Sequence, residues 1–216
     1  QIVSKALKLD VEHYPIIRYN VSSPITVNET QSLSVMCEAY GNPIPNVIRW
    51  KNRQSGSLLT FGNLSRQDTG TYTCEATSNS TKYGTLTSQK QLDISVQYAP
   101  DIKVIVSGNT TQNQTVVIVC EARGVPANNT FYPWVHVWVN GVIRVELQGR
   151  SNLTHMTLNI DRLSLENSGT YICSATNGIA GDNGKFEQSG SEFLNVIGIV
   201  DILHKKNKSH LSDICL

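Results

Sequence analysis

Apolar and polar residues alternate along most of this chain, which predicts β-strands rather than helices. In Leu33–Cys37 every second residue is apolar and would face a core, and Val116–Cys120 repeats that arrangement. Turn residues interrupt these stretches, as in Gly41-Asn42-Pro43-Ile44-Pro45. The pattern indicates a series of short strands, each with one buried side.

A longer spaced pattern occurs twice in register. Each copy has apolar residues two apart, then a polar residue and a glycine, and then a tyrosine and a cysteine two apart. The copies read Leu59-x-Phe61-x-x-Leu64-x-x-x-Asp68-x-Gly70-x-Tyr72-x-Cys74 and Leu158-x-Ile160-x-x-Leu163-x-x-x-Asn167-x-Gly169-x-Tyr171-x-Cys173. The repeat predicts two domains of the same construction.

A cysteine and a tryptophan precede each copy: Cys37 and Trp50, then Cys120 and Trp138. With the Tyr-x-Cys segments, these residues closely resemble the immunoglobulin fold and its tyrosine corner. The resemblance implies an all-β chain of two tandem immunoglobulin-like Greek-key β-sandwiches. It implies buried core residues and two B-to-F disulfides, namely Trp50, Tyr72, Trp138, Tyr171, Cys37–Cys74 and Cys120–Cys173. Reduced thiols in a cytosolic, muscle-type domain are the alternative.

Two details of domain two stay open within this resemblance. We favour Trp138 as the core tryptophan because it precedes Asn140-Gly141, a strong hairpin-turn signal. Trp134 is the alternative, because it lies 14 positions after Cys120 where domain one has 13. With Trp138 inward, His136 would be a half-buried histidine near the end of the sandwich, and Asn167 replaces the Asp of domain one.

The length of 216 residues suits two such domains. We expect domain one at 21–98, domain two at 99–198 and a tail at 199–216. Residues 1–20 would be a linker, and the first 15 or so resemble the last strand of a preceding immunoglobulin domain; a leader segment is the alternative. The short interval between Trp50 and Tyr72 favours a constant-like or intermediate-type sandwich.

The tail carries a basic cluster at 204–208 and the unpaired Cys215. The unpaired cysteine suggests intermolecular pairing or a partner elsewhere.

N-glycosylation sequons are far more frequent than composition explains. Nine Asn-x-Ser/Thr triplets occur where about three are expected by chance. They are at Asn20, Asn28, Asn63, Asn79, Asn109, Asn113, Asn128, Asn152 and Asn207. With the cysteines, they predict an extracellular chain, either secreted or the ectodomain of a membrane protein.

The chemistry that the chain lacks narrows its function. Charged residues are 16% and the formal net charge is +1, so we expect no nucleic-acid partner. No apolar run is long enough for a membrane span. We find no catalytic motif, calcium loop or phosphate-binding loop, and therefore expect no enzyme activity, no cofactor and no metal.

The expected contact surface is the C–C′–F–G sheet. In domain two, Val135–Gln148 and Tyr171–Val196 contain no sequon, so glycans would leave this sheet accessible. The candidate contact residues are Arg49, Lys51, Arg144, Glu146, Lys185 and Phe186.

The linker Val96-x-Tyr98-x-Pro100 resembles multi-domain adhesion receptors of the nephrin, nectin and hemicentin type. That resemblance implies a recognition module that binds a cell-surface or extracellular protein, in some cases homophilically, or a glycan. One alternative is a secreted innate-immune protein in which these domains precede a lectin-like region. The other is a structural spacer pair in a longer array.

Overall fold

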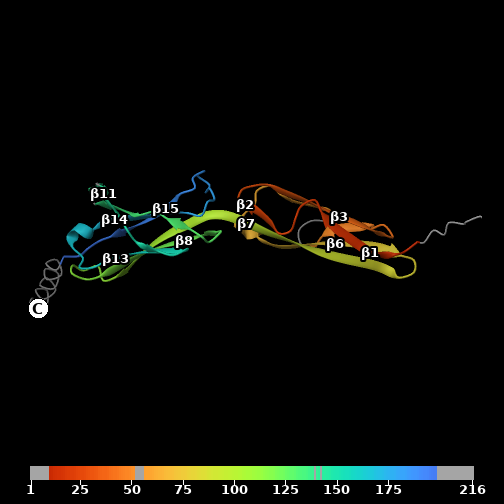
Figure 1. Cartoon of the computed structure of the whole chain (residues 1–216), viewed down its shortest axis with the longest axis horizontal. Coiled ribbons are helices and arrows are strands. Elements are labelled where there is room, and N and C mark those ends of the chain that lie inside the picture. The colour runs from red at the N-terminus through yellow and green to blue at the C-terminus, as the bar shows by residue number, and fades with distance from the viewer. Residues whose placement is uncertain (1–9, 52–55, 139, 142, 199–216) are drawn as a thin grey trace, which may run out of the picture. The chain divides into compact units, whose positions relative to one another are not determined.

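The computed structural model describes residues 10–51, 56–138, 140–141 and 143–198, with the side chains of 143–146 excepted. Within them the chain forms two compact units divided between Gln97 and Tyr98 (Figure 1). This division is one residue from the boundary expected from the sequence. Both units are all-β, as the alternating pattern predicts.

Domain one is a sandwich of two sheets. The first has three antiparallel strands in the order β1 (His13–Tyr19), β3 (Leu33–Asn42) and β5 (Leu58–Phe61). The second has the order β2 (Ile25–Asn28), β7 (Gly84–Gly108), β6 (Gly70–Ser80) and β4 (Val47–Trp50). Strand β1 pairs with β3 in the first sheet, whereas β2 pairs in parallel with β7 in the second. The chain therefore crosses between the sheets after β1.

The first strand corrects the expected start of domain one. Strand β1 pairs with β3, and Ile17 is buried in the core of domain one. The expectation that residues 1–20 form a linker outside domain one is therefore wrong for His13–Tyr19. The hypothesis of a preceding domain falls mainly on residues 1–9, which lie outside the described residues.

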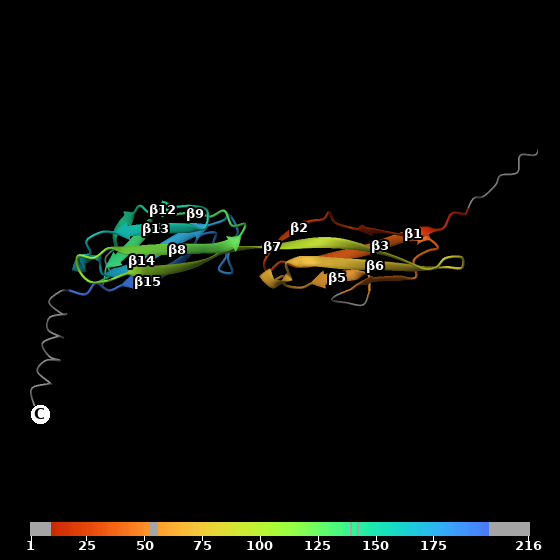
Figure 2. The same ribbon diagram turned by 90° about the horizontal axis from the view of Figure 1, so that it is seen from below.

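Domain two is also a sandwich of two sheets (Figure 2). In the first, the second part of β7 is followed by β8 (Val116–Val125), β13 (His155–Ile160) and β12 (Arg150–Ser151). The second has the order β11 (Ile143–Leu147), β10 (Trp134–Trp138), β14 (Gly169–Thr176) and β15 (Gln188–Leu194), and β9 (Thr130–Phe131) pairs with β14. Strand β7 thus serves both domains, pairing with β6 through Ile94 and with β8 from Tyr98.

A disulfide joins the two sheets at the centre of each domain. The bonds Cys37–Cys74 and Cys120–Cys173 confirm the pairing that the family resemblance implied. All four cysteines are buried with the surrounding aliphatic residues. The paired cysteines are 37 and 53 residues apart in sequence, so each disulfide stabilises its domain by about 4 kcal/mol in the chain-entropy account.

The core tryptophan of domain two is Trp134, so the assignment of Trp138 was wrong. In domain one Trp50 pairs directly with Cys74. In domain two Val135 pairs with Ile172, which brings the preceding residue, Trp134, level with Cys173. Trp134 is 0% exposed, whereas Trp138 is half-buried.

The tyrosine corners hold the two sandwiches in the same way. Tyr72 Oη donates to the backbone oxygen of Asp68 at 2.8 Å, and Tyr171 Oη donates to that of Asn167 at 3.0 Å. Short 3₁₀ turns, Arg66–Asp68 and Leu165–Asn167, precede these tyrosines. The Asn side chain reproduces the local role of the Asp, because each accepts a backbone N–H from the serine three residues earlier.

His136 is more deeply buried than the sequence suggested, with 3% exposure. Its ring stacks on Tyr171 with centroids 4.3 Å apart and an interplanar angle of 10°. Gly169 makes room for it, since a Cβ at that position would lie 2.6 Å from His136 Nε2 and would clash with the backbone oxygen of Val137. His136 is therefore part of the packed interior of domain two.

The corrected register makes a testable prediction about the two tryptophans. Trp134→Ala should destabilise domain two by about 3–5 kcal/mol, because it removes a fully buried indole from beside the disulfide. Trp138→Ala, the matched control, should cost clearly less because that ring is half-buried. Denaturant unfolding followed by circular dichroism measures both. The opposite order of effects would contradict the assignment.

Candidate functional site

The outward face of β4, β6 and β7 in domain one carries a charged cluster around Glu75. The strand register places Arg49, Glu75 and Gln89 in one row across the three strands. Glu75 accepts hydrogen bonds from Arg49 Nε at 3.1 Å and Nη2 at 2.8 Å, and from Gln89 Nε2 at 2.8 Å. Lys51 Nζ lies 3.4 Å from the second carboxylate oxygen. Two of the predicted contact residues are thus brought together.

The electrostatics of this Glu75 cluster follow from the hydrogen bonds that Glu75 accepts. Glu75 is only 8% exposed, whereas the Arg49 side chain is 57% exposed. The hydrogen bond from Arg49 is the main cause that lowers the pKa of Glu75, and Gln89 and Lys51 add to it against the opposing effect of burial. Both cations therefore already have an anionic partner within the domain, which reduces their availability to a ligand.

Most of the rest of this face is polar, with Val47 as an exposed apolar residue on it. In the neighbouring row Val47 pairs with Thr77, and Thr77 pairs with Thr87, their hydroxyl oxygens 3.3 Å apart. Asn79 follows on the same side of β6 and is exposed. A glycan on Asn79 would stand on this face and obstruct a partner that approached it.

The corresponding face of domain two carries apolar side chains interspersed with hydroxyl-bearing ones. Outward residues of β10, β14 and β15 alternate with the buried Trp134 and Tyr171 and form two rows across the sheet. The rows are Val135–Ile172–Ser191 and Val137–Thr170–Phe193. We name Val135, Val137, Ile172 and Phe193 the domain-two apolar patch. Phe193 is 48% exposed, and the other three are half-buried.

The sequence did not identify this patch. The four contact residues that the sequence predicted for domain two were Arg144, Glu146, Lys185 and Phe186. Lys185 and Phe186 are exposed but lie in the connection between β14 and β15 rather than on the sheet. The backbones of Arg144 and Glu146 are in β11, where Glu146 pairs with Val135, and their side chains lie outside the described part of the structure.

None of the sequons lies on the patch. Of the eight described sequon asparagines, Asn28 is half-buried and the others are exposed. In domain two they lie in connections between strands, at Asn109, Asn113, Asn128 and Asn152. The outward positions of β10, β14 and β15 therefore carry no acceptor asparagine.

Other classes of site are not apparent in the described residues. They contain no group of three or more His, Cys, Asp or Glu side chains that could hold a metal ion. None of the helices among them is long and apolar enough to cross a membrane. The tail with its basic cluster, Asn207 and Cys215 lies outside the described residues.

Comparison with known proteins defines the family. The family model "Immunoglobulin domain" matches residues 15–78 and 100–177. The chain therefore belongs to the immunoglobulin domain family, with one copy of the domain in each half.

Several relatives align with both domains. Human IgLON family member 5 is 28% identical over 173 residues, which are 77% of this chain and 50% of that protein. Mouse limbic system-associated membrane protein is 26% identical over 204 residues, 88% of this chain and 57% of that protein. The chain thus spans about half the length of these relatives. Among solved structures, a mutated titin fragment of three such domains matches with a TM-score of 0.45 and 19% identity, covering 86% of this chain and 67% of that one.

The Glu75 cluster predicts that two substitutions raise the pKa of Glu75 by different amounts. Arg49→Gln should raise the pKa of Glu75 toward its ordinary value, and Lys51→Gln should raise it less, because Arg49 is the largest cause of the lowering. Because the pKa of Glu75 is lower in the folded chain than in the unfolded chain, the ionised carboxylate stabilises the fold at pH values above the unfolded pKa. That contribution is lost as the pH falls through the folded pKa. Carboxyl NMR titration measures these shifts. An unchanged Glu75 pKa in the Arg49 variant would contradict the cluster.

Proposed function

We propose that this chain is a non-enzymatic, extracellular recognition module that binds a protein through the domain-two apolar patch. The observation that carries the proposal is the patch itself: four aliphatic or aromatic side chains on the outward side of a sheet, with no sequon among them. Contiguous exposed apolar surface on a folded domain is typical of interaction sites.

Energetics favour this face over the charged face of domain one. Burying a large aliphatic or aromatic side chain contributes up to about 1.5–3 kcal/mol, whereas an exposed ion pair contributes about 0–1 kcal/mol. Arg49 and Lys51 are in addition already paired with Glu75. The hydroxyls of Thr170 and Ser191 beside the patch provide polar contacts that fix the orientation of a partner.

The chemistry of the patch favours a protein over a glycan as the partner. Its described side chains are aliphatic, aromatic or hydroxyl-bearing, and such a surface complements another apolar protein surface. Two buried disulfides and nine sequons support an extracellular location for this encounter. A patch of this size gives weak single contacts, so arrays of such domains on opposed surfaces would gain strength by multivalency.

A new glycan on the patch tests the proposal. Ser189→Asn creates an Asn-Gly-Ser sequon on β15, on the same side of the sheet as Phe193. His155→Asn, the matched control, creates an Asn-Met-Thr sequon on β13 of the opposite sheet. A multimerised chain is screened against a panel of cell-surface ectodomains that includes the chain itself. Occupancy of each new sequon is verified by the gel shift that a glycosidase reverses.

We expect the Ser189→Asn glycan to abolish binding to the ectodomain that the unmodified chain recognises, and the His155→Asn glycan to preserve it. Binding that survives the glycan on β15 would refute the patch as the contact surface. Failure to bind any ectodomain in the panel would favour the structural-spacer function instead.

A further inference from the structure

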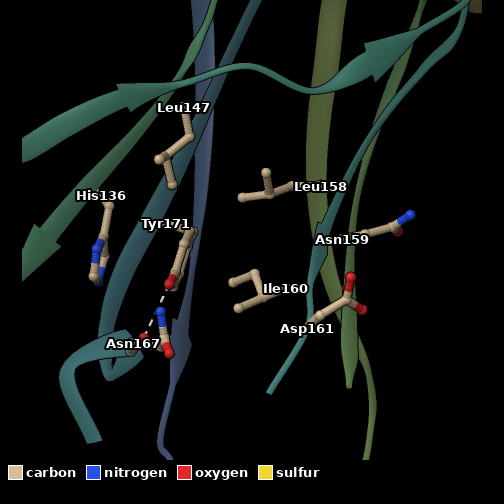
Figure 3. A pocket seen from close by; sticks show the side chains of 8 residues that line it. All are labelled: His136, Leu147, Leu158, Asn159, Ile160, Asp161, Asn167 and Tyr171. Carbon is tan, nitrogen blue, oxygen red and sulfur yellow. Dashed lines mark hydrogen bonds between the residues drawn. The ribbon is translucent and has the colours of Figure 1, made fainter. Parts of the chain in front are cut away.

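Domain two contains a cavity of about 460 Å³ that lies between its two sheets and opens to solvent, separate from the domain-two apolar patch. Among the described residues, those that line it are His136, Leu147, Leu158, Asn159, Ile160, Asp161, Asn167 and Tyr171. Figure 3 shows Leu158 and Ile160 extending from β13 toward the rings of His136 and Tyr171, while Asn159 and Asp161 point away. The side chains of Leu158, Ile160, His136 and Tyr171 thus give the cavity apolar and aromatic walls.

The repeat within the chain indicates what this space accommodates. Ile160 occupies the position that Phe61 occupies in domain one, three residues before a buried leucine in each copy. There the Phe61 ring packs edge-on against the tyrosine-corner Tyr72, with centroids 5.5 Å apart and an interplanar angle of 82°. Domain two keeps the tyrosine, as Tyr171, but replaces the phenyl ring with a smaller aliphatic side chain.

The walls of the cavity are held in place. Tyr171 is fixed at its hydroxyl by the backbone oxygen of Asn167 and at its face by the stacked His136 ring. His136 Nε2 lies 3.3 Å from the backbone oxygen of Ser168. Collapse of these rings into the space would break those contacts, so the cavity is preformed.

A polar group of defined chemistry also lines the cavity. Asn167 occupies the position of Asp68 and uses its Oδ1 to accept hydrogen bonds from the backbone N–H and the hydroxyl of Ser164. Its Nδ2 makes no hydrogen bond within the described part of the chain, and Figure 3 shows the amide beside the Tyr171 hydroxyl. Domain one presents a carboxylate there, which only accepts, whereas domain two presents an amide that donates.

We propose that this cavity binds a small planar aromatic molecule that carries a hydrogen-bond acceptor. The ring takes the place of the missing phenyl group against Tyr171, and the acceptor receives a hydrogen bond from Asn167 Nδ2. This site goes beyond the protein-recognition function proposed above, because it uses the interior of the sandwich rather than its outward face.

Domain one supplies the matched variants for the test. Ile160→Phe installs the ring that domain one has and should occupy the part of the cavity beside Tyr171, where the proposed ligand ring would lie. Asn167→Asp installs the carboxylate that domain one has, retaining the acceptor for Ser164 and removing the donor. The probes are acetophenone, which has an aromatic ring and a carbonyl acceptor, and ethylbenzene, which has the same ring without the acceptor. Binding is measured from the methyl NMR shifts of Leu147, Leu158 and Ile160 during titration.

In the unmodified chain we expect saturable binding of acetophenone with a dissociation constant of about 1 mM, the range for a ligand of this size. Ethylbenzene should bind several-fold more weakly, because it lacks the hydrogen bond. Ile160→Phe should abolish the shifts for both probes while the melting temperature is maintained or raised. Asn167→Asp should reduce acetophenone to the affinity of ethylbenzene.

Three results would overturn the proposal: no saturable shifts with either probe, equal binding by Ile160→Phe, or an acetophenone preference that Asn167→Asp leaves intact. If Ile160→Phe does not fold, Leu158→Phe adds a ring on the same wall of the cavity and should weaken both probes. Unchanged affinity in a folded Leu158→Phe variant would equally refute the site.

Discussion

Each half of this protein depends on one crosslink between stacked sheets. The disulfide joins the B strand of one sheet to the F strand of the other, and strand pairing brings a tryptophan level with the second cysteine of each bond. Because side chains alternate across a strand, fixing Cys74 and Cys173 inward also fixes which neighbours face outward. The Glu75 cluster, the domain-two apolar patch and the cavity beside Tyr171 all follow from that register.

Short-range spacing was sufficient to predict much of the fold. The Tyr-x-Cys segments and their preceding polar-Gly corners are local and could be recognised in the sequence, and their resemblance to the immunoglobulin fold implied the disulfides and the tyrosine corners. The identity of the core tryptophan of domain two could not be inferred, because Trp134, His136 and Trp138 share one side of β10. The Asn140-Gly141 turn was correctly placed, since Gly141 N–H donates to the backbone oxygen of Trp138 at 2.8 Å. What the sequence does not show is the length of strand between the tryptophan and that turn.

The first strand was misplaced for a related reason. Edge strands with similar alternation look alike in sequence, and only the partner strand distinguishes the first strand of one domain from the last strand of another. The apolar patch was missed because Val135 and Val137 alternate with Trp134 and His136, so neither side of β10 is clearly polar. The cavity was missed because the repeat shows Ile160 in the place of Phe61 but not how Ile160 packs against the residues around it.

The two domains share a frame but differ in what they place on it. Domain one fills its interior with Phe61 and covers its outward sheet with paired charges and threonines. Domain two leaves space beside Tyr171 and has an outward sheet that is apolar and clear of sequons. These differences are the basis for proposing domain two, rather than the more polar domain one, as the recognition domain.

Non-reducing peptide mapping of the secreted chain tests the central claim most directly. The account predicts two crosslinked peptide pairs, one containing Cys37 with Cys74 and the other Cys120 with Cys173. Free thiols at these positions, or a crosslink between a cysteine of domain one and a cysteine of domain two, would contradict it.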